Sequence, residues 1–187
     1  MPAKSKLKIE AKGIIQELRL LDLLSQHGEV RVVGSVALDL IVKLDIDIHV
    51  LIPEKTGLLN AVDPIYHQLL DCQQVREVRI TDYRKQNAIK IGIDVYSGAS
   101  GDWSIDIWIT DKVEETAFEY VENLKRAIRP VHRDAILCIK GYYDRRGQIR
   151  DGISVLIYEA VIDNDVRTVE EFKQFLSRRG KATKPVD

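Results

Sequence analysis

The chain has 187 residues, a length that suits one sizeable domain or two smaller lobes. Apolar residues make up 45% and charged residues 30%, so the chain can bury a core and still present a soluble surface. Its 28 basic and 29 acidic side chains give a net charge of −1, which provides no overall attraction to nucleic acid or anionic membranes. The composition therefore does not favour long nucleic acid as a partner.

Cysteine usage and the N-terminal segment predict where the protein works. The two cysteines, Cys72 and Cys138, lie in apolar helical patterns, as free thiols in a reducing compartment do. Residues 1–12 are basic but lack the apolar core of a signal peptide, and no apolar run approaches the roughly 20 residues of a membrane-spanning helix. We expect a cytoplasmic protein without a membrane partner, and the sequence is compatible with a homodimer.

The first half of the chain shows the periodicities of a mixed β-sheet with flanking helices. Gly28 ends a first helical pattern, and Asp63-Pro64 is typical of an N-cap followed by proline at the first helical position. In chain order the sequence predicts a helix over 7–27, a strand over 29–33, a helix over 35–43, a strand over 45–52, a helix over 63–72 and a strand over 75–81.

Residues 88–96 and 103–110 alternate in polarity and predict a hairpin with a longer loop. If its two isoleucine faces are buried together, Val95 joins the buried side and Tyr96 the opposite side. The same parity puts Lys90, Asp94, Asp106 and Trp108 on that opposite side.

The second half of the chain is helical in its pattern. The sequence predicts helices over 112–128, 132–146 and 153–163, and a capping box at Thr168 and Glu171 predicts a last helix through about residue 178. Strands first and helices after them indicate an α+β fold, with a catalytic lobe over 1–111 and a C-terminal helical lobe over 112–187 packed on it.

A glycine-serine turn and three carboxylates form the main candidate site. Gly34-Ser35 opens a helix directly after a strand, and Asp45 and Asp47 follow on the next strand. Because residues i and i+2 of a strand share a face, both carboxylates point the same way. Asp106 stands in similar apolar surroundings on a later strand. Carboxylates beside a turn of this kind suggest a magnesium site that handles a nucleotide.

This pattern resembles the signature of the DNA polymerase β-like nucleotidyltransferase superfamily. The signature has an apolar residue, Gly-Ser or Gly-Gly, nine to thirteen residues, Asp-apolar-Asp/Glu-apolar, and a later acidic residue on a strand. The match covers residues 28–52 and 103–110. In place of the Ala-Arg-Gly that many small members have after Gly-Ser, this chain reads Ala37-Leu38-Asp39, so Lys43 is the candidate to replace the missing arginine.

The resemblance implies a nucleotidyltransferase-like mixed sheet and an enzyme that moves a nucleoside monophosphate from an NTP, such as ATP, to an acceptor hydroxyl, with release of pyrophosphate. It implies Mg²⁺ as cofactor, with Mn²⁺ as an alternative, held by Asp45, Asp47 and Asp106. Gly34, Ser35 and Lys43 would bind the triphosphate. In related polymerases a lysine on a later helix also contacts the triphosphate, and Lys140 holds the corresponding place in chain order.

Several alternatives stay open. Asp94 competes with Asp106 for the place of third metal ligand, and His49 shares the face of the aspartates. The acceptor is a small molecule, a protein side chain or an RNA 3′ end. The alternative function is a catalytically silent regulatory protein that binds a nucleotide or a metal on the same fold.

Overall fold

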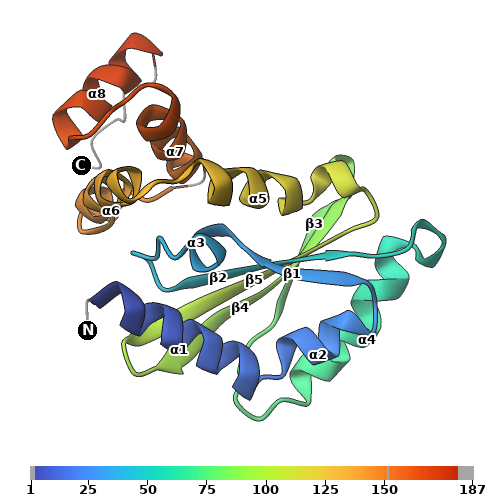
Figure 1. The fold of residues 1–187 in the computed structure, drawn as a ribbon. Coiled ribbons are helices and arrows are strands. Elements are labelled where there is room, and N and C mark those ends of the chain that lie inside the picture. The colour runs from blue at the N-terminus through green and yellow to red at the C-terminus, as the bar shows by residue number, and fades with distance from the viewer. Residues whose placement is uncertain (1–2, 151, 181–187) are drawn as a thin grey trace. The chain divides into compact units, whose positions relative to one another are not determined.

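The computed structural model describes residues 3–150 and 152–180 of the chain (Figure 1). It consists of two compact units, Met1–Leu124 and Lys125–Asp187. The lobe boundary expected after residue 111 stays a prediction. Among the described residues, none of the helices combines the length and the apolar character that a membrane span requires.

The first unit is built on a five-stranded mixed sheet, as the sequence predicted for an α+β fold. The order across the sheet is β1-β2-β5-β4-β3. β2 pairs with β5 in parallel, and the other neighbouring strands are antiparallel. The strands are β1 (Glu29–Val33), β2 (Asp45–Leu51), β3 (Arg79–Tyr83), β4 (Ala88–Gly98) and β5 (Gly101–Thr110).

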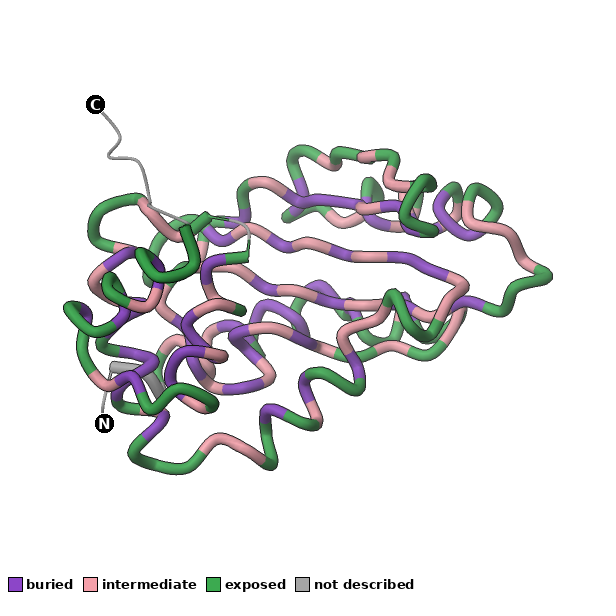
Figure 2. The backbone as a smooth tube through the Cα atoms, turned by 90° about the horizontal axis from the view of Figure 1, so that it is seen from above, coloured by how far each residue is buried: buried purple, intermediate pink, exposed green. Residues whose placement is uncertain are grey.

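One face of this sheet is apolar and is covered by α1 (Ala3–Glu17), α2 (Leu20–Ser25) and α4 (Leu58–Leu70) (Figure 1). Isoleucines and valines at alternate strand positions meet apolar side chains of these helices in one core. Buried and partly exposed residues alternate along β2 and most of β5 (Figure 2), and the partly exposed positions of β2 include Asp45, Asp47 and His49. The core therefore fixes which side chains the polar face presents.

Three predicted helices of this unit have different bounds. The pattern over 7–27 is two helices, because Arg19 adopts a left-handed conformation with φ 49° that interrupts the first. The helix expected over 35–43 is α3 (Gly34–Leu38), which ends because Asp39 is also left-handed, at φ 59°. The helix expected from Asp63 begins at Leu58, with Pro64 inside it.

The strand expected over 75–81 lies at Arg79–Tyr83, and β4 departs from simple alternation. An irregularity in the β4–β5 register between Ile93 and Tyr96 inserts an extra position. As a result Val95, expected in the core, is 46% exposed, and Tyr96 is buried instead. Burial is the first cause of the rise in the pKa of Tyr96 to about 12, and a hydrogen bond with Glu17 adds to it.

The segment expected to be one helix over 112–128 is a 3₁₀ turn, Val113–Glu115, followed by α5 (Phe118–Ala127). The break has a specific cause, because the backbone N–H of Ala117 donates a 3.1 Å hydrogen bond to Nδ1 of His49 on β2. Two further 3₁₀ turns, Glu54–Thr56 and Arg84–Gln86, precede α4 and β4.

The second unit contains α6 (Pro130–Asp144), α7 (Ile153–Asp163) and α8 (Val169–Arg178). The preceding helix ends at Ala127, close to the residue 128 expected, and Pro130 stands in the first turn of α6, where a missing N–H costs nothing, so α6 begins two residues earlier than expected. The predicted capping box is confirmed, since Thr168 accepts from the N–H of Glu171 and the Glu171 side chain accepts from the N–H of Thr168.

Candidate functional site

The polar face of the sheet brings the predicted carboxylates together in rows across neighbouring strands. Register partners share a face, so one row runs from Val33 through Asp47, Asp106 and Gly92 to Arg79. The next row contains Arg31, His49, Trp108, Lys90 and Thr81.

Asp47 and Asp106 are register partners in the parallel pair β2–β5, and Asp45 is the partner of Ser104. The intervening residues Ile46 and Ile48 are fully buried on the other face. Because that burial fixes the alternation, all three aspartates must lie on the polar face. The backbone register therefore places the three aspartates on the same face of two neighbouring strands, as expected.

Gly34 stands directly against this row. It follows Val33, the register partner of Asp47, and has a φ of 59°, a left-handed conformation that side chains disfavour. A Cβ added to Gly34 would overlap Oδ2 of Asp47. The glycine is therefore required twice, for its backbone conformation and for the space beside the carboxylate.

Ser35 and Lys43 both contact Asp45, the first carboxylate. The buried Ser35 hydroxyl donates to Oδ1 of Asp45 at 3.4 Å. Nζ of Lys43 lies 3.8 Å from Oδ2 of Asp45, and the Lys43 side chain is 54% exposed. Two of the predicted triphosphate-binding residues thus lie beside the Asp-x-Asp pair.

Asp106 and Asp94 flank Gly92 on the polar face. A Cβ on Gly92 would lie 3.5 Å from Oδ1 of Asp106 and 3.6 Å from Oδ1 of Asp94. Each carboxylate faces a different cation, since Nζ of Lys90 is 3.2 Å from Oδ2 of Asp106 and the Arg79 guanidinium is 2.5 Å from Oδ2 of Asp94. The parity argument that placed Asp94 near Asp106 agrees with this arrangement.

His49 is held as a neutral ring. Its Nδ1 accepts the Ala117 N–H, and burial lowers the pKa of His49 to about 4. The centre of the His49 ring lies 6.3 Å from the centre of the Trp108 ring. The Tyr83 ring also lies beside Trp108, with 5.0 Å between the ring centres. His49 therefore anchors the segment before α5, with one ring nitrogen already engaged.

Lys140 lies on α6 and belongs to the second unit. Its side chain is buried, with 3% of the residue exposed, and Nζ donates a 3.3 Å hydrogen bond to the Tyr158 hydroxyl on α7. Its proposed contact with a triphosphate stays a prediction.

The fit of a metal ion can be tested on these residues. Within 3–150 and 152–180, no three His, Cys, Asp or Glu side chains are grouped closely enough to hold a metal ion. Asp106 is instead turned toward Lys90. The donor set still suits magnesium, because carboxylates supply hard oxygen ligands, and the missing side chain at Gly34 lets the Asp47 carboxylate lie directly against the backbone there.

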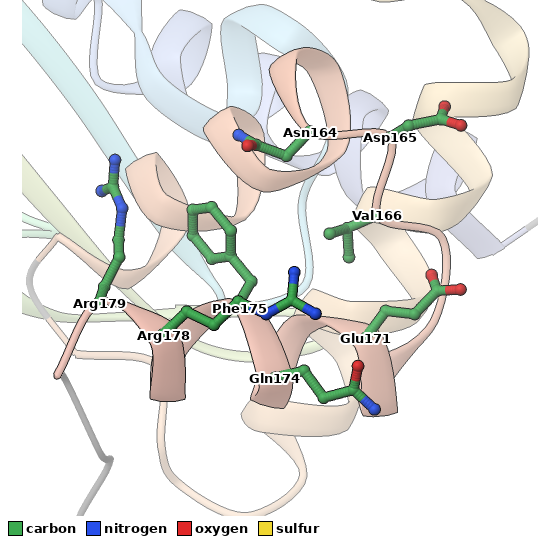
Figure 3. Close-up of a pocket in the computed structure, with 8 residues that line it drawn as sticks. All are labelled: Asn164, Asp165, Val166, Glu171, Gln174, Phe175, Arg178 and Arg179. Carbon is green, nitrogen blue, oxygen red and sulfur yellow. The ribbon is translucent and has the colours of Figure 1, made fainter.

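Two surface hollows lie elsewhere. One, of about 610 Å³, is lined by α8 and the loop before it, including Phe175, Arg178 and Arg179 (Figure 3). The other, of about 460 Å³, lies beside Gly57 and Arg84 in the first unit. Neither of these hollows is lined by a predicted site residue.

Sequence reasoning placed Lys90 on the polar face but assigned it no role, and it did not notice Gly92 or Arg79. Strand alternation alone could have placed Lys90 and Gly92 on the same face of one strand, because they are two residues apart. Their positions opposite Trp108 and Asp106 depend on the β4–β5 register, which no local pattern specifies.

Comparisons with known proteins agree with this geometry at the level of the fold. No family model matches the chain, and no curated protein matches it in sequence. Among solved structures, Cid1 poly(U) polymerase with MgGTP bound is similar over 76% of this chain and 44% of that chain, with 16% identity and a TM-score of 0.58.

A Cid1 mutant bound to MgATP gives a TM-score of 0.62 at 17% identity, over 84% of this chain and 51% of that chain. A cytoplasmic RNA terminal U-transferase gives a TM-score of 0.60 at 16% identity, over 82% of this chain and 47% of that chain. The chain thus spans about half the length of these nucleotidyltransferases and has their fold.

Proposed function

We propose that this protein is a magnesium-dependent nucleotidyltransferase that moves a nucleoside monophosphate from an NTP to an acceptor hydroxyl. One observation carries the proposal: Asp47 and Asp106 are partners in the parallel register, with the backbone of Gly34 against Asp47. The fold shared with nucleotidyltransferases that bind MgGTP and MgATP supports it.

Asp45 and Asp47 would hold the divalent cation, and Asp106 is the third candidate ligand beside them. The cation would neutralise the triphosphate and polarise the α-phosphorus. Gly34 has no side chain of its own, so the Asp47 carboxylate packs directly against its backbone, and the triphosphate would bind where this backbone and Asp47 meet. The half-exposed Lys43 adds positive charge at the same end of β2.

The acceptor side of the site would lie at Asp106. There the acceptor oxygen attacks the α-phosphorus in line, the bond to the β-phosphate oxygen breaks, and pyrophosphate leaves with the β- and γ-phosphates. Asp106 would orient the acceptor hydroxyl, whose proton is lost to solvent.

The direct test is release of pyrophosphate from each of the four NTPs with Mg²⁺, in the presence of pooled acceptors. The pool contains aminoglycosides, short RNA oligonucleotides and peptides with free hydroxyls. Asp45→Asn/Asp47→Asn should abolish release. Asp82→Asn, which removes an exposed aspartate of β3 that pairs with Arg84, is the matched control and should release pyrophosphate normally.

Binding of an NTP by the wild type without turnover on any acceptor would contradict this proposal. That result would favour the regulatory protein.

A further inference from the structure

We propose that the ammonium group of Lys90 occupies the place of a second divalent cation beside Asp106. The site would then take one divalent ion per chain, at Asp45 and Asp47. This inference rests on the proposed function, because it concerns the same carboxylates.

Lys90 is held against Asp106 by its position in the sheet. It lies on β4, which pairs with β3 on one side and β5 on the other, and its register partners are Thr81 and Trp108. Nζ is 3.2 Å from Oδ2 of Asp106 and 5.6 Å from the centre of the Trp108 ring. The ammonium is thus placed between a carboxylate and an aromatic face, both of which attract a cation.

Lys43 provides an internal comparison, because it also faces a site carboxylate. Its side chain is 54% exposed, whereas that of Lys90 is 24% exposed. Lys43 precedes β2 in a segment without regular structure, and its Nζ is 3.8 Å from Asp45. An arriving cation can therefore displace Lys43 into solvent at little cost, whereas displacing Lys90 would break its contacts with both Asp106 and the Trp108 ring.

Charge then decides how many metal ions bind. A divalent cation and an ammonium at the same carboxylate repel each other, and this repulsion is strong in a partly buried site. Asp106 is half-buried, with its side chain 35% exposed, and Lys90 is adjacent to it. A second ion at Asp106 is therefore disfavoured as long as Lys90 keeps its contact.

In the same position, the Lys90 ammonium would also bind the acceptor. An ammonium has three N–H donors, so one bond to Asp106 leaves donors for an acceptor oxygen. Lys90 would thus orient the acceptor together with Asp106.

The test counts Mn²⁺ ions bound per chain, by titration followed with the electron paramagnetic resonance signal of free Mn²⁺. We expect one ion for the wild type and two for Lys90→Met, which frees Asp106. Lys90→Arg keeps the cation and should bind one. Lys112→Met, which removes a lysine paired with Glu54 away from the carboxylate row, is the control for net charge and should also bind one. Circular dichroism checks that each variant is folded.

The outcomes separate the two proposals. Two ions on the wild type, or one ion on folded Lys90→Met, would overturn the role of Lys90 and leave the proposed function standing. If the wild type binds no Mn²⁺, both proposals fail. If Lys90→Met does not fold, the test uses the wild type and Lys90→Arg. The inference requires that each binds one ion and that Asp45→Asn/Asp47→Asn loses this ion. Two ions on either protein would overturn it.

Discussion

Asp47 and Asp106 stand next to each other as partners of the parallel strands β2 and β5, yet they meet different neighbours. Asp47 packs directly against the backbone of Gly34, and Asp106 has the ammonium of Lys90 beside it. The two carboxylates are therefore expected to act differently, one on the triphosphate and one on the acceptor.

Replacing Asp106 by Asn should lower kcat on the order of 10²-fold or more, as removal of a group used mainly in the transition state does. NTP affinity should change little, because Asp45 and Asp47 remain. Asp94→Asn should cost less, since Asp94 is paired with Arg79. Steady-state kinetics and NTP binding measure both effects. If Asp94→Asn loses activity and Asp106→Asn keeps it, the third carboxylate has been assigned to the wrong strand.

Gly34→Ala should weaken NTP binding strongly, because the new Cβ would overlap the Asp47 carboxylate. The left-handed backbone adds a stability loss of about 1 kcal/mol. Gly57→Ala is the matched control, since Gly57 is also at positive φ, 74°, while its Cβ would meet nothing closer than the Asn60 amide at 3.6 Å. Calorimetric titration with NTP compares the two variants, and equal NTP affinities would refute triphosphate binding at Gly34.

His49 should make the protein less stable in mild acid. Its pKa is lowered to about 4 in the fold from an ordinary 6.5, so between these values the unfolded chain binds the extra proton. Stability is thus fully present above about pH 6.5 and is lost as the pH falls toward 4, by about 2 kcal/mol between pH 7 and 4.5.

His49→Asn keeps an acceptor for the Ala117 N–H but does not titrate, so this part of the pH dependence should disappear. Denaturant unfolding between pH 4.5 and 7 measures it. Glu10 also loses stabilisation as the pH falls toward its ordinary pKa of 4.5, but it does so equally in the wild type and in His49→Asn, so the difference between the two reports His49. An unchanged slope in His49→Asn would show that another group is responsible.

Glu10 on α1 ties down the loop between β4 and β5. It accepts the N–H of Ser100 at 2.9 Å and the indole N–H of the fully buried Trp103 at 3.0 Å. Burial alone raises the pKa of Glu10, but its hydrogen bonds from Ser100 and Trp103 outweigh that and lower it overall. Glu10→Ala should cost about 1–3 kcal/mol, because a buried donor loses its partner. Glu10→Gln retains an acceptor and should cost less in thermal unfolding; equal losses would contradict this account.

The strands and the faces of the site could be read from the sequence because local alternation specifies them. The three aspartates alternate with buried isoleucines along their strands, so burial of the isoleucines places the carboxylates on the opposite face. The bounds of β1 and α7 agree with the prediction for the same reason, since periodicity is strong there.

Other features depend on contacts distant in the sequence. The helix α3 ends at Leu38 because Asp39 is left-handed. The helix α5 starts after Ala117, whose N–H donates a hydrogen bond to His49. The bulge before Tyr96 reverses the parity at the end of β4. The ion pair of Lys90 with Asp106 depends on strand register, which a local pattern does not specify.

The parallel pairing of β2 with β5 also has a consequence for synthesis of the chain. α4, β3 and β4 must all be made before β5 can dock beside β2. Closing so long a loop is entropically costly and slow compared with forming a hairpin. Asp47 and Asp106 therefore remain apart on a nascent chain until β5 has left the ribosome, and the proposed site cannot assemble before that step.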